Sequence, residues 1–144
     1  MTNQSLMDGT RNKKGSKMTT LHQSRQEIFD KAYIGLKSQD FKQSQIESPD
    51  FIGVTFCCYR DGNGLSCAIG HCISDDDYSE FLESKSVDDP DILRRINHQP
   101  EDLDFLMELQ DCHDLEASRS PHMMKRELEC FARNYNLNIP QTEK

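Results

Sequence analysis

Cys67 and His113 are the two side chains that could serve as a nucleophile and its base. The Cys67 thiol follows a glycine-rich stretch, "DGNG", and begins "CAIG". Amide groups at the first turn of a helix would lower the pKa of such a thiol and bind an oxyanion. His113 would be the base, with Asp114 or Asp111 orienting its ring. The catalytic candidates are therefore Cys67, His113 and Asp114. Alternatively, Cys67 is a small buried residue, and His113 and Asp114 cap a helix end.

Cysteine and histidine residues around the same turn also suggest zinc, which binds four such donors in a tetrahedron. Five candidates fall within 16 residues: Cys57, Cys58, Cys67, His71 and Cys72. Cys67 and His71 would share a helix face, but Cys72 would point about 100° away from His71, and no C-x₂-C pair is present. We expect no resident cofactor, with buried thiols and an exposed histidine. Zinc at these five residues is the alternative.

Acidic residues concentrate in one part of the chain. Residues 75–116 contain 15 acidic and three basic residues, a net charge of −12, whereas the whole chain carries −8. A surface of this kind steers association with a basic partner. The candidate binding residues are Arg60, Asp75, Asp76, Asp77, Tyr78, Asp102 and Asp104. The simpler alternative is that the acids favour solubility and helix first turns, and that Arg60 pairs with a nearby acid.

Composition excludes several classes of protein. The net charge of −8 argues against direct nucleic-acid binding, which needs a basic face. No apolar run approaches the roughly 18 residues of a membrane span, and the N-terminal stretch lacks the apolar core of a secretory signal. We therefore expect a cytoplasmic protein whose six cysteines remain free thiols.

The chain divides into one domain and two tails. Residues 1–20 are polar, carry a net charge of +3 and lack apolar periodicity, which predicts a disordered basic tail. Residues 21–140 are expected to form a single globular domain, and residues 141–144 a second tail.

Helix-start signals recur along the predicted domain. They are a capping box formed by Ser24 and Glu27, Asp89 before Pro90, Pro100, and Ser120 before Pro121. Apolar residues at helical spacing follow these starts. The sequence therefore predicts a mainly helical chain.

The β-structure is predicted around the glycine turn. Residues 51–60 are rich in β-branched and aromatic residues and predict a strand, whereas residues 37–50 are predicted as a loop. Residues 65–73 fit either the return strand of a hairpin or a helix capped by Ser66, and we favour the helix because Leu65, Ile69 and Ile73 keep a period of four. The expected fold is α+β, a mainly helical single domain of four to five helices with one short strand or β-hairpin.

The chain resembles a family of small uncharacterised proteins of tailed phages and prophages. The resemblance covers residues 26–137 and lies in "QEIFDKAYIGL", "CYRDGNGLSCAIGHCISDDDYSEFLESKSV", "FLMELQDCHD" and "LECFARNYNL". The family pattern contains Cys-x-Tyr-Arg, Leu-x-Cys-Ala-Ile/Val-Gly, Glu-Gly-x-Ser-Val and Leu-Gln-x-x-His-Asp. Ser84 stands where this pattern has glycine, and Ser74-Asp75 where it has proline and an acid. The resemblance implies that Cys67 and His113 are shared positions, and it implies a phage setting without indicating a reaction.

Small size, polarised acidity and this resemblance together predict a phage or prophage accessory protein. We expect it to bind a host protein with a basic surface in the bacterial cytoplasm, and to modulate or inhibit that protein. A defence enzyme or a nucleic-acid enzyme would offer such a surface. The alternatives are a cysteine-dependent enzyme that uses Cys67 and His113, and a small zinc-stabilised domain.

Overall fold

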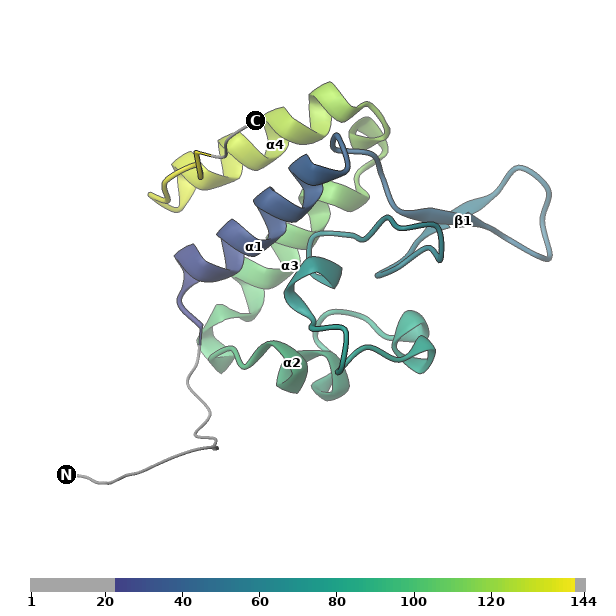
Figure 1. Cartoon of the computed structure of the whole chain (residues 1–144), viewed down its shortest axis with the longest axis horizontal. Helices are drawn as coiled ribbons and strands as arrows, with labels where there is room; N and C mark the ends of the chain where they lie inside the picture. The colour runs from purple at the N-terminus through teal and green to yellow at the C-terminus, as the bar shows by residue number, and fades with distance from the viewer. Residues whose placement is uncertain (1–22, 142–144) are drawn as a thin grey trace.

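The computed structural model describes residues 23–141, which fold into four α-helices and one two-stranded antiparallel sheet (Figure 1). The helices are α1 (Arg25–Ser38), α2 (Pro90–Ile96), α3 (Leu103–Asp114) and α4 (Pro121–Asn134), and the strands are β1 (Gln45–Glu47) and β2 (Thr55–Cys57). Four short 3₁₀ helices connect them: η1 (Gly70–Cys72), η2 (Glu80–Ser84), η3 (Pro100–Asp102) and η4 (Glu116–Arg119). The predicted α+β, mainly helical fold is confirmed. The predicted tails lie outside the described residues, apart from Gln141.

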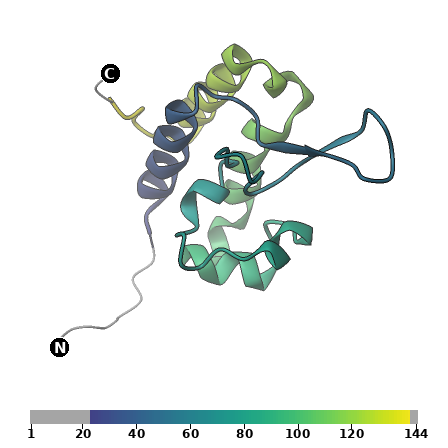
Figure 2. The same ribbon diagram turned by 45° about the vertical axis from the view of Figure 1, so that its right-hand side comes forward.

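Three helices pack side by side around an aromatic core. Phe29 of α1 stacks on Phe131 of α4, with ring centroids 5.9 Å apart, and Phe105 of α3 lies 5.1 Å from Phe131. All three rings are buried. Figures 1 and 2 show the β1–β2 hairpin projecting away from this helical body. Among residues 23–141, no helix combines the length and the apolar character that a membrane span requires.

The four helix starts predicted at Ser24, Asp89, Pro100 and Ser120 are confirmed. Ser24 and Glu27 form the reciprocal capping box of α1, Asp89 caps α2 with Pro90 in its first turn, and Ser120 caps α4. Pro100 begins η3, which continues directly into α3. These signals were reliable because a cap depends only on neighbouring residues.

The predicted loop at residues 37–50 is partly wrong, because it contains strand β1. The predicted strand at residues 51–60 is reduced to β2, and Ile46 of β1 lies directly opposite Phe56 of β2. Three residues are too few to show the alternation by which a strand is recognised in a sequence.

The predicted helix that begins at Ser66 is also wrong in its start. Ser66 forms an antiparallel bridge with Arg60, and the Cys67 amide donates to the Tyr59 carbonyl at 3.2 Å. The glycine stretch therefore closes a small hairpin, which was the alternative interpretation. A helical turn follows only afterwards, where the His71 amide donates to the Cys67 carbonyl at 3.0 Å. The return strand and the helix that were predicted as alternatives are thus both present, one directly after the other in the chain.

Gly70 is the point where this turn touches the preceding strand. A Cβ atom built on Gly70 would lie 2.2 Å from the Tyr59 carbonyl oxygen. That oxygen belongs to the backbone and already accepts a hydrogen bond from Cys67, so it has little freedom to move. Glycine is therefore required by space at this position.

We expect Gly70→Ala to lower the free energy of unfolding by more than about 2 kcal/mol, because the backbone of the turn must separate from Tyr59. Urea denaturation measures the loss. Gly53→Ala is the matched control, since Gly53 has open space around it and a positive φ of 83°, so that it carries a backbone cost of about 1 kcal/mol alone. Equal losses in the two variants would show that the contact with Tyr59 is unimportant.

Candidate functional site

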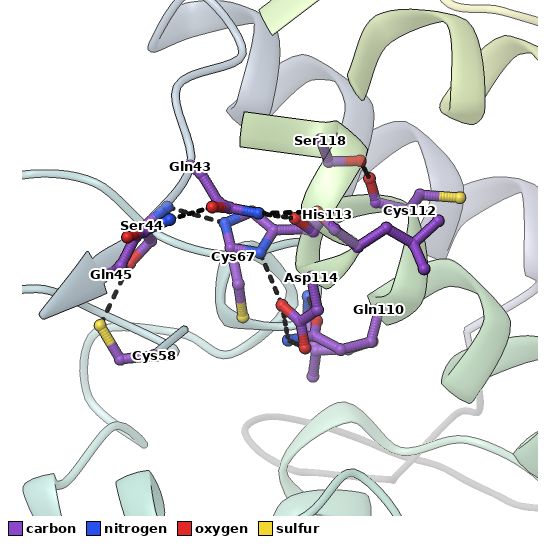
Figure 3. A network of polar contacts seen from close by, with 12 residues as sticks. Gln43, Ser44, Gln45, Cys58, Cys67, Gln110, Cys112, His113, Asp114 and Ser118 are labelled. Carbon is purple, nitrogen blue, oxygen red and sulfur yellow. Dashed lines mark hydrogen bonds and ion pairs between the residues drawn. The ribbon is translucent and has the colours of Figure 1, made fainter. Parts of the chain in front are cut away.

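His113 occupies the centre of a buried polar network at the end of α3 (Figure 3). The ring is inaccessible to solvent. Its Nε2 lies 2.8 Å from the backbone nitrogen of Ser44, and its Nδ1 lies 2.7 Å from Oδ1 of Asp114. An amide N–H can only donate, so Nε2 must be unprotonated and accept this hydrogen bond. The neutral ring therefore carries its proton on Nδ1 and donates it to Asp114.

This arrangement leaves His113 without the lone pair that a general base needs. The unprotonated nitrogen points at the Ser44 amide, and the other nitrogen already bears a proton. Accepting a second proton at Nε2 would place two N–H groups against each other in a buried site, which is costly. His113 therefore acts here as a fixed acceptor for the backbone.

Cys67 is fully buried and does not have the character of a nucleophile. Its burial, followed by the nearby Asp114 carboxylate, raises the pKa of the thiol well above its ordinary value. The Gly70 amide donates to Sγ at 3.2 Å, and this contact acts in the opposite direction without overcoming the burial. A thiol is reactive as its thiolate, which this environment disfavours.

Gln110 connects the two sequence motifs in which these residues lie. Its Oε1 accepts a hydrogen bond from the Ile69 amide at 3.0 Å, and its Nε2 donates to the two carboxylate oxygens of Asp114 at 3.3 and 3.2 Å. "CAIG" and "LQDCHD" are thus joined through one buried amide side chain. The network contains both Cys67 and His113, and its hydrogen bonds hold segments of the chain together.

Sequence reasoning missed three members of this network. They are Gln43, whose side chain donates to the His113 carbonyl at 2.6 Å, and Ser44 and Gln110. Only Gln110 left a signal in the sequence, because it is an amide on the apolar face of a predicted helix. Gln43 and Ser44 lie about seventy residues before His113, and no local pattern identifies them as its partners.

We expect His113→Phe to destabilise the protein by about 2–4 kcal/mol, because it leaves the buried Ser44 amide and Asp114 without their partner. Urea denaturation at neutral pH measures this loss. His122→Phe is the control, since His122 is exposed on α4 and its replacement should change stability by less than about 0.5 kcal/mol. A His113→Phe variant as stable as the parent would refute the scaffold role.

The five predicted zinc ligands lie in separate environments. Cys58 contacts the Ser44 hydroxyl at 3.4 Å, the Cys72 thiol donates to the Ile28 carbonyl, and His71 faces Gln39. Among residues 23–141, the group of potential ligands that converges is Cys57, His113 and Asp114, with ligand atoms within 4.8 Å of one another. Of the five predicted ligands, this group includes only Cys57.

The chemistry of this group does not suit a metal ion. A metal on Nδ1 of His113 would move the ring proton to Nε2, which would then face the Ser44 N–H at 2.8 Å. Burial, followed by the Asp114 carboxylate, raises the pKa of Cys57 to about 12, so its sulfur is a thiol that must release its proton before it can bind a metal. The three side chains fit one another as hydrogen-bonding partners and do not fit a metal.

His71 packs against α1 on the other side of the turn. Its Nε2 lies 2.9 Å from Gln39 Oε1, and a Cβ on Gly35 would meet its ring at 2.3 Å. Gln39 Oε1 also accepts from the Ser66 amide, so the His71 nitrogen is a donor. Burial, as the largest cause, lowers the pKa of His71 to about 4. The predicted exposed histidine is instead a packed residue.

Because the folded pKa of His71 lies below its ordinary value of 6.5, the unfolded chain binds more protons between pH 6.5 and pH 4. Stability contributed by neutral His71 is complete above pH 6.5 and is lost as the pH falls toward 4. We expect a loss of about 2 kcal/mol between pH 7.5 and pH 5, measured by urea denaturation. His71→Gln should reduce this dependence, whereas His122→Gln should leave it unchanged. An unaltered slope in His71→Gln would contradict the assignment.

Arg60 is held by three neighbours at the edge of the turn. Its guanidinium bonds the Asp75 carboxylate at 2.8 Å and the Ile73 carbonyl at 2.8 Å, and it lies 4.5 Å from the centre of the Tyr78 ring. A surface cavity of about 590 Å³ lies beside Arg60 and Asp75. Since Asp75 neutralises the arginine, this cavity offers no net positive charge to an anion. Arg60 therefore pairs with a nearby acid, Asp75, as the alternative prediction for this residue stated.

Glu83 is a further residue that sequence reasoning missed. Its carboxylate accepts from the Tyr59 amide at 2.8 Å and the Arg60 amide at 3.0 Å, and the Tyr78 hydroxyl donates to it at 2.5 Å. It therefore satisfies a stretch of backbone that has no neighbouring strand on that side. Ser84 does not adopt a positive φ, so a serine at this position costs no backbone strain.

The predicted acidic binding residues divide into exposed and buried members. Asp102 is buried and pairs with Arg25 at 2.7 Å, so it is not available to a partner, and its assignment to a binding surface was wrong. Asp75, Asp76 and Asp77 are exposed, and so is Asp104 at the start of α3.

Comparison of the chain with models of protein families, with curated proteins and with solved structures finds no match. The arrangement of the side chains themselves therefore carries any assignment of function.

Proposed function

We propose that the protein is a phage or prophage accessory protein that binds a host protein with a basic surface and modulates or inhibits it, without a catalytic role of its own. The observation that supports this most directly is the exposed run Asp75–Asp77, in which Asp75 pairs with Arg60 and Asp76 and Asp77 face solvent. The side chains that resembled a catalytic pair are committed to the buried network, so surface recognition is the better-supported activity.

The turn that carries these aspartates is ordered. The amides of Asp77 and Tyr78 donate to the Ser74 carbonyl at 3.0 and 3.1 Å, and the Ser74 hydroxyl donates to the Asp77 carboxylate. Arg95 of α2 donates to the Asp77 carbonyl at 2.8 Å. Carboxylates displayed on a fixed turn lose little conformational entropy when a partner binds.

The three basic residues of the acidic segment do not neutralise this run. Lys85 lies 3.4 Å from the Asp91 carboxylate, and Arg94 pairs with the same side chain. Arg95 donates to backbone carbonyls. Arg60 neutralises Asp75, so the negative potential of Asp76 and Asp77 is what remains available to steer a basic partner.

A basic groove that normally holds nucleic acid is a suitable partner for such a run. Carboxylates at short spacing can occupy the positions of phosphates, and the same lysines and arginines would recognise both. Host defence enzymes and nucleic-acid enzymes are the class of protein with this surface. The setting in phages rests on the sequence resemblance.

We expect Asp76→Asn/Asp77→Asn to weaken capture of such a partner from bacterial host lysate by on the order of tenfold, because charges at the contact set the association rate. In this experiment the full-length chain is immobilised and incubated with lysate at about 50 and 200 mM salt. We expect the parent chain to recover the partner in stoichiometric amounts. Glu127→Gln/Glu129→Gln removes the same charge from α4 and is the matched control.

Two outcomes would contradict the proposal. The first is that no stoichiometric partner is recovered at any salt concentration. The second is an equal loss of capture in both double variants, which would assign the effect to net charge alone.

The two other functions predicted from the sequence gain no supporting observation. A cysteine-dependent enzyme would need His113 to face Cys67 with a free nitrogen, and both ring nitrogens have other partners. A zinc-stabilised domain would need its ligands to converge, and Cys58, His71 and Cys72 contact unrelated parts of the chain.

A further inference from the structure

The β1–β2 hairpin turns its apolar face toward solvent. Ile46 and Phe56 are directly opposite in the strand register, so their side chains lie on the same face of the ribbon. Val54 lies two residues from Phe56 and shares that face. These three side chains are 46%, 54% and 41% exposed. The opposite face carries the polar residues Gln45, Glu47 and Thr55.

The tip of the hairpin extends this apolar area. Phe51 is 65% exposed and Ile52 is completely exposed. The tip is nevertheless ordered, because the Ser48 hydroxyl accepts from the Phe51 amide at 3.2 Å and the Ser48 amide donates to the Val54 carbonyl at 2.7 Å. We call Ile46, Phe51, Ile52, Val54 and Phe56 together the hairpin surface.

A surface of this kind calls for a covering layer. A two-stranded ribbon is marginally stable in water and needs further strands or a packed layer. The five side chains expose on the order of 500 Å² of apolar area, which reaches the largest patches seen on monomeric proteins. Within residues 23–141 no segment covers them, since all five are exposed. The stretch that precedes residue 23 is polar and basic and holds no apolar run to match them.

We propose that a second copy of this chain covers the hairpin surface, so that two hairpins pack face to face about a twofold axis. Apolar faces of two ribbons pack about 10 Å apart, and a twofold axis places the same five residues on both sides. Burying about 500 Å² on each copy removes roughly 1,000 Å² from solvent in total, which is the lower limit for a specific interface.

The distribution of charge favours a second copy over the basic partner discussed above. Residues 45–57 contain two charged residues, Glu47 and Asp50, and Glu47 lies on the face away from the hairpin surface. The acidic segment belongs to the body from which the hairpin projects (Figures 1 and 2). Two acidic bodies held apart by their hairpins repel weakly, because charges are screened over about 8 Å at physiological salt. A basic surface would gain nothing from covering apolar side chains.

Sedimentation velocity of the full-length chain between about 1 and 100 μM tests this inference, which does not rest on the proposed function. We expect a species of twice the 16.6 kDa chain mass that strengthens with salt, whereas binding through the acidic run weakens with salt. Phe56→Glu and Ile52→Glu should each raise the dissociation constant of the dimer at least 100-fold. Ile34→Glu is the control, because Ile34 is similarly exposed on α1 and should leave the dimer intact.

Three results would overturn the inference. The first is a parent chain that remains monomeric at about 100 μM. The second is that Ile34→Glu dissociates the dimer to the same degree as the hairpin variants. The third is that the parent is monomeric and binds a different protein, and that Ile52→Glu abolishes this binding. Circular dichroism confirms folding of each variant. If Phe56→Glu does not fold, Ile52→Glu decides the question, because its fully exposed side chain has no packing to lose.

Discussion

The hydrogen bond from the Ser44 amide to Nε2 of His113 is the constraint on which the centre of the molecule depends. It is buried, and it determines that the ring proton lies on Nδ1 and is donated to Asp114. Asp114 in turn accepts from Gln110, and Gln110 accepts from the Ile69 amide. One tautomer thus connects the segment after α1, the end of α3 and the turn that contains Cys67. The Ser44 amide, the His113 ring and the Gln110 side chain are buried, so each would be left unsatisfied without its partner, whereas Asp114 also reaches solvent.

A histidine used in this way is unavailable for chemistry. A general base must present a lone pair to a substrate or nucleophile, and His113 presents its lone pair to the backbone. Cys67 is similarly committed, as an acceptor for the Gly70 amide in a fully buried position. The residue types that suggest catalysis in the sequence are therefore those that hold the turn to the helices. In the proposed function, recognition is carried by the surface, where the aspartates and the hairpin are found.

The accuracy of the sequence predictions followed the range of the interactions involved. The caps at Ser24, Asp89 and Ser120 were correct because each depends on residues two or three positions away. The start at Ser66 was wrong because a bridge to Arg60 took priority over a cap. The contact of His113 with Asp114 was predicted, but its acceptor role was not, since a backbone amide 69 residues earlier determines it. Buried Asp102 was assigned to the surface for the same reason, because its partner Arg25 is distant in sequence.

The two proposed surfaces would reinforce each other. A single exposed carboxylate contributes little to affinity, because water and salt screen its interactions. Two copies joined through their hairpins would present Asp75–Asp77 twice on one particle. Once the first run is bound, the second contact becomes intramolecular, and its effective concentration replaces the bulk concentration. This gain requires that both runs reach the same target, such as a long basic groove or a dimeric enzyme. A weak, salt-sensitive contact can thereby give stable binding without any further contact in the acidic turn.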